Sequence, residues 1–93
     1  MENLEPVRIT LAEKLDAAAA APLARDLLAV RGQAITLDAS KVKKIGGRCL
    51  QVLISAHLTW RADMIPDRID SPSATFREAL RDFAASHILN VAP

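Results

Sequence analysis

The stretch LDASKVKKIGGRCLQVL, residues 37–53, decides the fold of this chain. An apolar, strand-like run ends at Asp38, a lysine-rich loop follows, and Gly46 and Gly47 open a segment with helical periodicity. Loops that bind phosphate, or that are switched by phosphorylation, are built in this way. A phospho-switch needs a hydroxyl group, but the centre of this loop is Gly46, Gly47 and Arg48. The question is whether the loop carries chemistry or serves as a docking surface.

The residues before this stretch predict one strand and one helix. Apolar and polar side chains alternate over residues 7–11, which is typical of a half-buried strand. Residues 15–32 predict a helix, with Asp16 as its N-cap and Gly32 just after its last turn. Because proline is tolerated only in a first turn, the helix is expected either to begin near Pro22 or to bend there.

The remaining residues predict two more strands and two more helices. The apolar run at residues 34–37 indicates an interior strand covered on both faces. Residues 47–63 have helical periodicity, and residues 65–69 predict a strand whose proline places it at a sheet edge. The pair Ser71-Pro72 predicts the start of the last helix, with Ser71 as its N-cap.

Strands that alternate with helices predict an α/β fold with a mixed, largely parallel β-sheet and helices packed on it. The 93 residues are expected to form one domain. Its core would span about residues 7–84, and residues 86–93 would form a tail that frays or caps the domain.

Composition argues against several classes of protein. The formal net charge is +1 and the chain holds one Trp, two Phe and no Tyr, so neither a basic field nor a stacking surface favours nucleic-acid binding. Cys49 is the one cysteine, which fits a reducing cytosol. The N-terminus lacks the apolar core of a signal peptide, and no apolar run approaches a membrane span. A cytoplasmic protein without membrane insertion is expected.

Residues 37–53 resemble the signature of the STAS domain, the fold of anti-sigma factor antagonists, which runs roughly Leu-Asp-x-Ser-x-Val-x-x-Ile-Asp-Ser-Ser-Gly-Leu. The segment RIDSPSATFREAL, residues 68–80, is similar to the last strand and last helix of that family. The resemblance covers about residues 7–83 and implies a STAS-type sandwich that binds proteins and is not an enzyme. The positions that match in register are Leu37, Asp38, Ser40, Val42, Ile45 and Leu50.

The departures from this signature bear on function. The resemblance places the phosphoacceptor serine of the family on Gly47 and the acidic residue before it on Gly46. Glycine has no hydroxyl, so the family's phospho-switch cannot operate at Gly47. The loop would then be a docking surface that is always available or is controlled from elsewhere.

The expected docking surface is the loop at residues 40–48 together with the exposed face of the following helix. Asp38 and Ser40 would shape the loop by bonding its backbone amides. The basic side chains would meet acidic groups on a protein partner. The residues expected to bind the partner are Ser40, Lys43, Lys44, Gly46, Gly47, Arg48, Gln51 and Ser55.

Single-domain STAS proteins of this departing type resemble two groups. The group from bacterial chemotaxis gene clusters implies binding to a chemotaxis histidine kinase. The group from lipid-transport ABC systems implies binding to the ATPase subunit. The sequence is closer to the chemotaxis group in its alanine-rich first helix and in residues 46–53 and 68–73. A signalling histidine kinase is therefore the expected partner. An anti-sigma factor antagonist switched at Ser40 or Ser71 is a further alternative.

A few residues could instead have a chemical role, in anion binding, as a reactive thiol or in metal binding. The two glycines could cradle an anion, but without P-loop spacing a tight turn that needs positive φ or close approach is favoured. Cys49 could be a reactive thiol, although its apolar spacing favours the core. His57 and His87 lack the company of metal ligands, so neither metal nor cofactor is expected. Trp60 fits an interface anchor and a core residue equally well.

Overall fold

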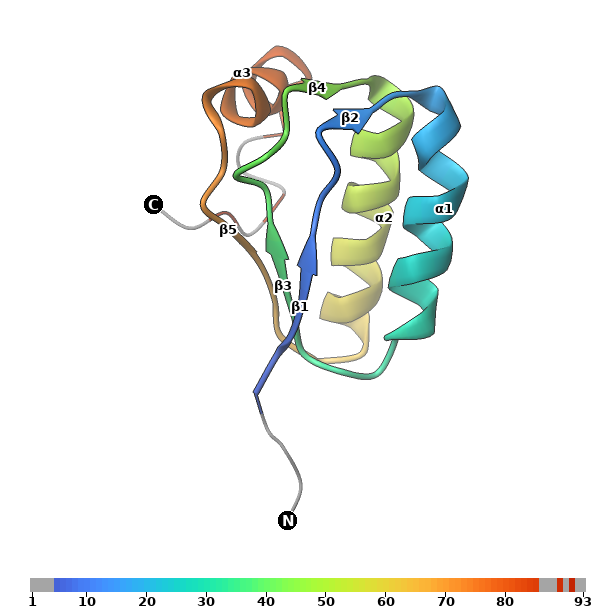
Figure 1. Ribbon diagram of the computed structural model, residues 1–93. Helices are drawn as coiled ribbons and strands as arrows, with labels where there is room; N and C mark the ends of the chain where they lie inside the picture. Colours follow the sequence, from blue (N-terminus) through green and yellow to red (C-terminus); the bar gives the residue numbers. More distant parts are fainter. Residues whose placement is uncertain (1–4, 86–88, 90, 92–93) are drawn as a thin grey trace.

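A small parallel sheet forms the centre of the computed structural model, which describes residues 5–85, 89 and 91 (Figure 1). Strands β1 (Val7–Thr10), β3 (Ile35–Asp38) and β5 (Asp67–Asp70) are paired in the order β1-β3-β5. The short strands β2 (Lys14–Leu15) and β4 (Lys44–Ile45) form a second parallel pair. The predicted α/β fold with a largely parallel sheet is confirmed.

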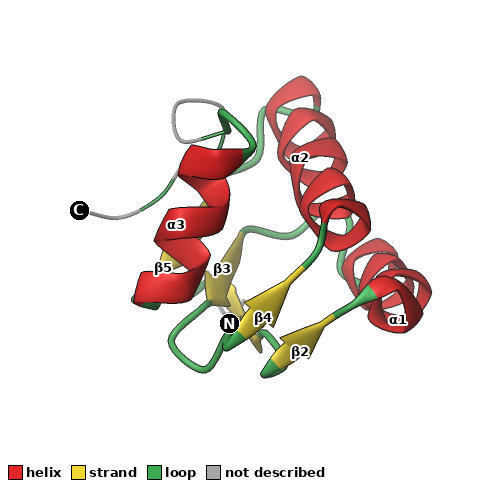
Figure 2. Cartoon of the chain, turned by 90° about the horizontal axis from the view of Figure 1, so that it is seen from above, coloured by secondary structure: helices red, strands yellow, loops and turns green. Residues whose placement is uncertain are grey.

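Two of the three helices lie side by side. Helices α1 (Ala17–Ala29) and α2 (Gly47–Ala62) pack against each other and run in the same direction (Figure 1). Helix α3 (Ala74–Asp82) lies apart from this pair and packs beside β4 (Figure 2). None of the helices among the described residues has the length and apolarity needed to cross a membrane.

One buried cluster joins the sheet to the helices. Alternation in β3 turns Ile35 and Leu37 inward, and the helices add Leu53 and Phe76, each no more than 4 % exposed. No charged or polar residue is buried among the described residues. Leu89 and Val91, the two described residues of the predicted tail, also contact the fold: Leu89 is buried, and Val91 bridges to β5. The rest of that tail lies outside the described residues.

Helix α1 shows how an interior proline is accommodated. Asp16 is the N-cap as predicted, and its carboxylate accepts a hydrogen bond from the Ala19 amide at 3.2 Å. The helix begins at Ala17, so the expected start near Pro22 is wrong. Pro22 cannot donate to the Ala18 carbonyl, but Ala18 is exposed and water can bond it. Gly32 follows the helix with a φ of 93°, as a C-terminal glycine should.

The two faces of β3 differ. The strand is interior, as predicted, because β1 and β5 flank it. The prediction that both its faces are covered is wrong, since Thr36 and Asp38 are only half-buried. The register places Asp38 between Thr10 and Asp70, so the second face of the sheet is polar. The sequence Ile-Thr-Leu-Asp alternates, and this alternation indicates one open face.

The start of α3 also differs from the prediction. Ser71 has a φ of 51° and precedes the helix, so it is not the N-cap. Ser73 caps α3 instead, because its hydroxyl oxygen accepts a hydrogen bond from the Phe76 amide at 3.1 Å. The same hydroxyl donates to the Val42 carbonyl at 2.6 Å, which joins α3 to the loop after β3.

Ser73→Ala should therefore destabilise the chain by about 0.5–2 kcal/mol, which is the usual cost of losing an N-cap. The measurement is urea unfolding followed by circular dichroism. Ser71→Ala is the matched control, since the exposed Ser71 caps nothing in α3. Equal losses in the two variants would contradict the assignment of the cap to Ser73.

Candidate functional site

A groove of about 540 Å³ lies between α1 and α2. Its lining is mostly apolar and includes three alanines as well as Leu27 and Leu28, with Trp60 at one end. The groove is open to solvent, and Leu28 on its rim is 67 % exposed. Ala20 and Ala24 of α1 face Val52 and Ala56 of α2 in the lining of this groove.

One wall of this groove carries three of the predicted partner-binding residues. Arg48, Gln51 and Ser55 all line it from α2 and are exposed. They share a face because residues three and four apart in a helix are neighbours. The contribution of α1, which supplies Ala20 and Ala24, was not predicted from the sequence.

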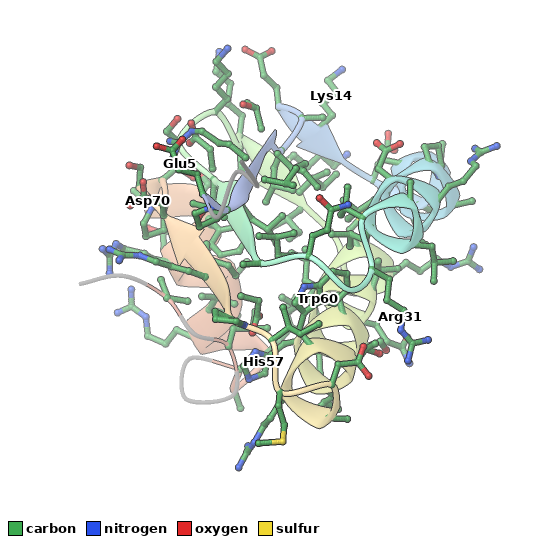
Figure 3. All side chains as sticks on the ribbon, turned by 90° about the horizontal axis from the view of Figure 1, so that it is seen from below. Glu5, Lys14, Arg31, His57, Trp60 and Asp70 are labelled. Atoms are coloured by element: carbon green, nitrogen blue, oxygen red, sulfur yellow. The ribbon has the colours of Figure 1, made fainter. Side chains whose placement is uncertain are left out.

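The two arginines of the groove have different electrostatic surroundings. The Arg31 guanidinium bonds Asp63 at 3.1 and 3.4 Å, and this hydrogen bond, with the charge of Asp63, raises the pKa of Arg31. Figure 3 shows Arg31 and Trp60 at the end of the molecule where α1 and α2 finish. Arg48 lies in the first turn of α2 and forms no ion pair within the described part of the chain. Its charge is available to a partner.

The predicted basic residues of the loop are held by the β2–β4 pair. The Lys43 and Lys44 amides both donate to the Glu13 carbonyl, at 2.8 and 3.0 Å. The Lys43 ammonium lies 3.5 Å from the Glu13 carboxylate, so part of its charge is matched. Lys44 is aligned with Lys14, a cation that sequence reasoning missed because the strand pairing is not local.

The two loop glycines do not need positive φ. Gly46 has a φ of −102°, and Gly32 is the one glycine with φ in the positive range. A Cβ atom on Gly47 would lie 3.5 Å from the Phe83 ring, and one on Gly46 would lie 3.8 Å from the Leu15 carbonyl oxygen. These are ordinary contacts, so the expectation of a turn that demands glycine is wrong. The contact of Phe83 with this loop was also not predicted.

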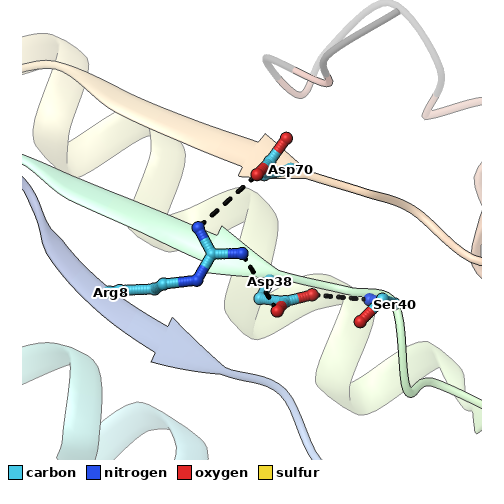
Figure 4. Close-up of polar contacts among 4 residues, drawn as sticks. All are labelled: Arg8, Asp38, Ser40 and Asp70. Carbon is cyan, nitrogen blue, oxygen red and sulfur yellow. Dashed lines mark hydrogen bonds and ion pairs between the residues drawn. The ribbon is translucent and has the colours of Figure 1, made fainter.

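Asp38 and Ser40 contact each other at the end of β3 (Figure 4). The Ser40 amide donates to the Asp38 carboxylate at 2.9 Å, which is the contact expected of a loop-shaping pair. Arg8 bonds the same carboxylate at 3.0 Å and reaches Asp70 at 3.5 Å. The backbone and side chain of Ser40, with the Arg8 guanidinium, lower the pKa of Asp38 to about 2. The structure thus groups Ser40 with the polar sheet face.

This low pKa predicts acid sensitivity. The pKa of Asp38 in the folded chain lies below its ordinary value of 3.8, so ionised Asp38 stabilises the fold above that pH. The stabilisation should disappear as the pH falls from about 4 to about 2. Asp38→Asn should reduce the slope of unfolding free energy against pH in this window, as measured by urea unfolding at several pH values. Asp26→Asn, at an exposed position, should keep the wild-type slope; an unchanged slope in Asp38→Asn would contradict this role.

Cys49, His57 and Trp60, for which the sequence left a functional role open, all make contacts within the fold. Cys49 is fully buried and its Sγ donates to the Asp16 carbonyl at 3.2 Å, while burial raises the pKa of the thiol. Burial and a raised pKa both disfavour a reactive thiolate. His57 Nδ1 lies 2.8 Å from the Asp67 carboxylate. Trp60 is a core residue whose indole N–H donates to the Gln33 carbonyl at 2.7 Å.

No group of three His, Cys, Asp or Glu side chains that could hold a metal ion occurs within the part of the chain that the structure describes. His87 lies outside that part.

The parallel sheet, the loop after β3 and the helix that follows it are consistent with an α/β domain of the STAS type. A family model described as "Mlab, STAS domain" matches residues 2–90. The chain therefore belongs to the STAS domain family. No curated protein matches it significantly. Membership indicates a signalling or regulatory module that acts through protein–protein contacts, in a family that is generally not enzymatic.

Proposed function

We propose that this chain is a non-catalytic docking module of bacterial signalling and that it binds a histidine kinase of the chemotaxis type. The observation that carries the proposal is the open groove between α1 and α2. Its lining is mostly apolar, and its wall ends at Arg48, which forms no ion pair with any described residue. Such a groove suits the apolar face of a partner element, and Arg48 suits an acidic group beside it.

The glycine at the family's phosphoacceptor position is consistent with docking that phosphate does not switch there. Gly47 lies in the first turn of α2, next to Arg48 and close to one end of the groove. A phosphate on a serine at this place would add negative charge beside Arg48 and change the docking surface. Gly47 excludes that modification, so the partner would find the same surface at all times.

The ATPase subunit of a lipid-transport ABC system is the second candidate partner, since the sequence resembles that group as well. The same groove would serve it, and the identity of the captured protein separates the two. An antagonist switched at another serine is the third candidate, because Ser40 and Ser71 are both exposed. Incubation with an anti-sigma kinase should leave both serines unmodified if the present proposal holds.

The test is affinity capture from a lysate of the native host, followed by mass spectrometry. We expect the wild-type chain to capture the chemotaxis kinase and the variant Lys43→Glu, Lys44→Glu, Arg48→Glu to lose it. The control is Arg25→Glu, Arg77→Glu, Arg81→Glu, which makes the same charge change at exposed positions outside the groove lining. Capture of a transport ATPase would favour the second candidate, and equal capture of the kinase by all three proteins would contradict the docking surface.

A further inference from the structure

The groove between α1 and α2 has a positive end and a negative end, because the dipoles of the two helices are aligned. Both helices cross between parallel strands, so they run side by side in the same direction (Figure 1). Their amino ends lie together, directly after the paired strands β2 and β4. Because each helix carries partial positive charge at its amino end and partial negative charge at its carboxyl end, the two dipoles reinforce each other along the groove.

The charged side chains also make the amino ends of the two helices positive. Near the amino ends, Arg48 and the aligned pair Lys14 and Lys44 are exposed and form no ion pair within the described residues. The acids at this end are already engaged, since Asp16 caps α1 and Glu13 pairs with Lys43. At the carboxyl ends, the charge of Arg31 is matched by Asp63, and the exposed Arg61 in the last turn of α2 lies outside the groove lining.

The dimensions of the groove fit one helix. Its α2 wall runs from Arg48 to Thr59, which at 1.5 Å per residue is a length of roughly 16 Å, or about three helical turns. The small side chains of Ala20, Ala24 and Ala56 allow a third helix to approach closely. Gln51 and Ser55 along the wall offer hydrogen bonds to a polypeptide, which an acyl chain would leave unused.

We propose that the groove holds one amphipathic helix of the partner, antiparallel to α1 and α2, with its carboxyl end and acidic side chains beside Arg48. In this orientation the negative end of the partner helix meets the positive ends of two helices and an unmatched guanidinium. The opposite orientation places like partial charges together at both ends. The inference deepens the docking role proposed above and rests on it.

The test uses two fluorescein-labelled, 18-residue helical peptides of identical composition. Both carry the same Leu and Ala stripe, but one has three Glu residues in its last turn and the other has them in its first turn. Fluorescence anisotropy gives the affinity of each for the whole chain. We expect the peptide with acidic residues at its carboxyl end to bind at least ten-fold more tightly, although acidic residues at the amino end stabilise the free helix more.

A matched pair of variants locates the binding. Ala24→Phe fills the groove from α1, whereas Ala21→Phe places the same ring on an exposed part of α1 outside the groove lining. We expect the favoured peptide to bind Ala24→Phe at least ten-fold more weakly and Ala21→Phe within two-fold of wild type. Failure of both peptides to bind, equal affinity for the two, or full affinity for Ala24→Phe would overturn the inference. Binding of oleate but of neither peptide would also overturn it and would point to a lipid ligand.

The two proposals fail in different ways. If the peptides behave as expected and the purified kinase does not bind, the groove inference stands and the proposed partner is wrong. If the kinase binds wild type and Ala24→Phe alike while the peptides show no preference, the kinase remains the partner but docks elsewhere on the chain, and the groove inference is wrong.

Discussion

Phe76→Ala should destabilise the chain by about 3–5 kcal/mol, the usual cost of truncating a buried phenylalanine. Phe76 has no exposed surface and is the largest of the fully buried side chains in the described core. Phe76 and Leu80 are the two buried residues of α3, and the Phe76 amide donates a hydrogen bond to the hydroxyl of Ser73. Since chains of this size have a total stability of about 5–15 kcal/mol, the variant should lose a large part of it.

Urea unfolding measures this loss, and Phe83→Ala is its matched control. Phe83 lies at the C-cap of the same helix but is 55 % exposed, so its truncation should cost no more than about 1 kcal/mol. Similar midpoints for the two variants would show that α3 does not depend on Phe76 for its packing.

Trp60→Ala is expected to have the second large effect, also about 3–5 kcal/mol. The indole is 2 % exposed, and its N–H donates at 2.7 Å to the Gln33 carbonyl, in the connection between α1 and β3. Truncation therefore leaves a cavity and breaks the link between α2 and that connection. Trp60→Phe keeps one aromatic ring and loses the donor together with the rest of the indole. We expect it to cost about 1 kcal/mol, because the exposed Gln33 lets water replace the lost donor.

Circular dichroism must follow this unfolding, since the chain has no second tryptophan to report it. Leu58→Ala on the same helix is the control, because Leu58 is 53 % exposed. If Trp60→Phe were as destabilising as Trp60→Ala, the hydrogen bond rather than the packing of the ring would hold this end of α2.

Local patterns explain what the sequence predicts correctly about the fold. The order of strands and helices follows from the change between two-residue and helical periodicity. Asp16 and Gly32 are recognisable as helix ends because capping depends on residues within one turn. The start of α3 was misplaced by the same local reasoning, since Ser71 and Ser73 both have capping side chains. Ser73 is the cap, and its hydroxyl also donates to the Val42 carbonyl, which is distant in the sequence.

Three residues of the candidate groove are recognisable from the sequence for the same reason. Arg48, Gln51 and Ser55 share one face of α2 because of their spacing, and all three line the groove. The opposite wall comes from an alanine-rich segment of α1 with no chemical signature, and it becomes recognisable only once the two helices are packed. The pairing of β2 with β4, which brings Lys14 beside Lys44, and the contact of Phe83 with Gly47 likewise join residues far apart in sequence.

We propose that the groove between α1 and α2 binds a signalling kinase. The most direct measurement is calorimetric titration of the purified chemotaxis kinase with wild-type chain, Ala24→Glu and Ala21→Glu. Docking of an apolar partner face would remove water from this carboxylate, which is costly, so we predict at least about 100-fold weaker binding of Ala24→Glu. Ala21→Glu, exposed on the same helix, should bind like wild type. Equal affinity of all three proteins, or no binding of the kinase by the wild-type chain, would contradict the claim.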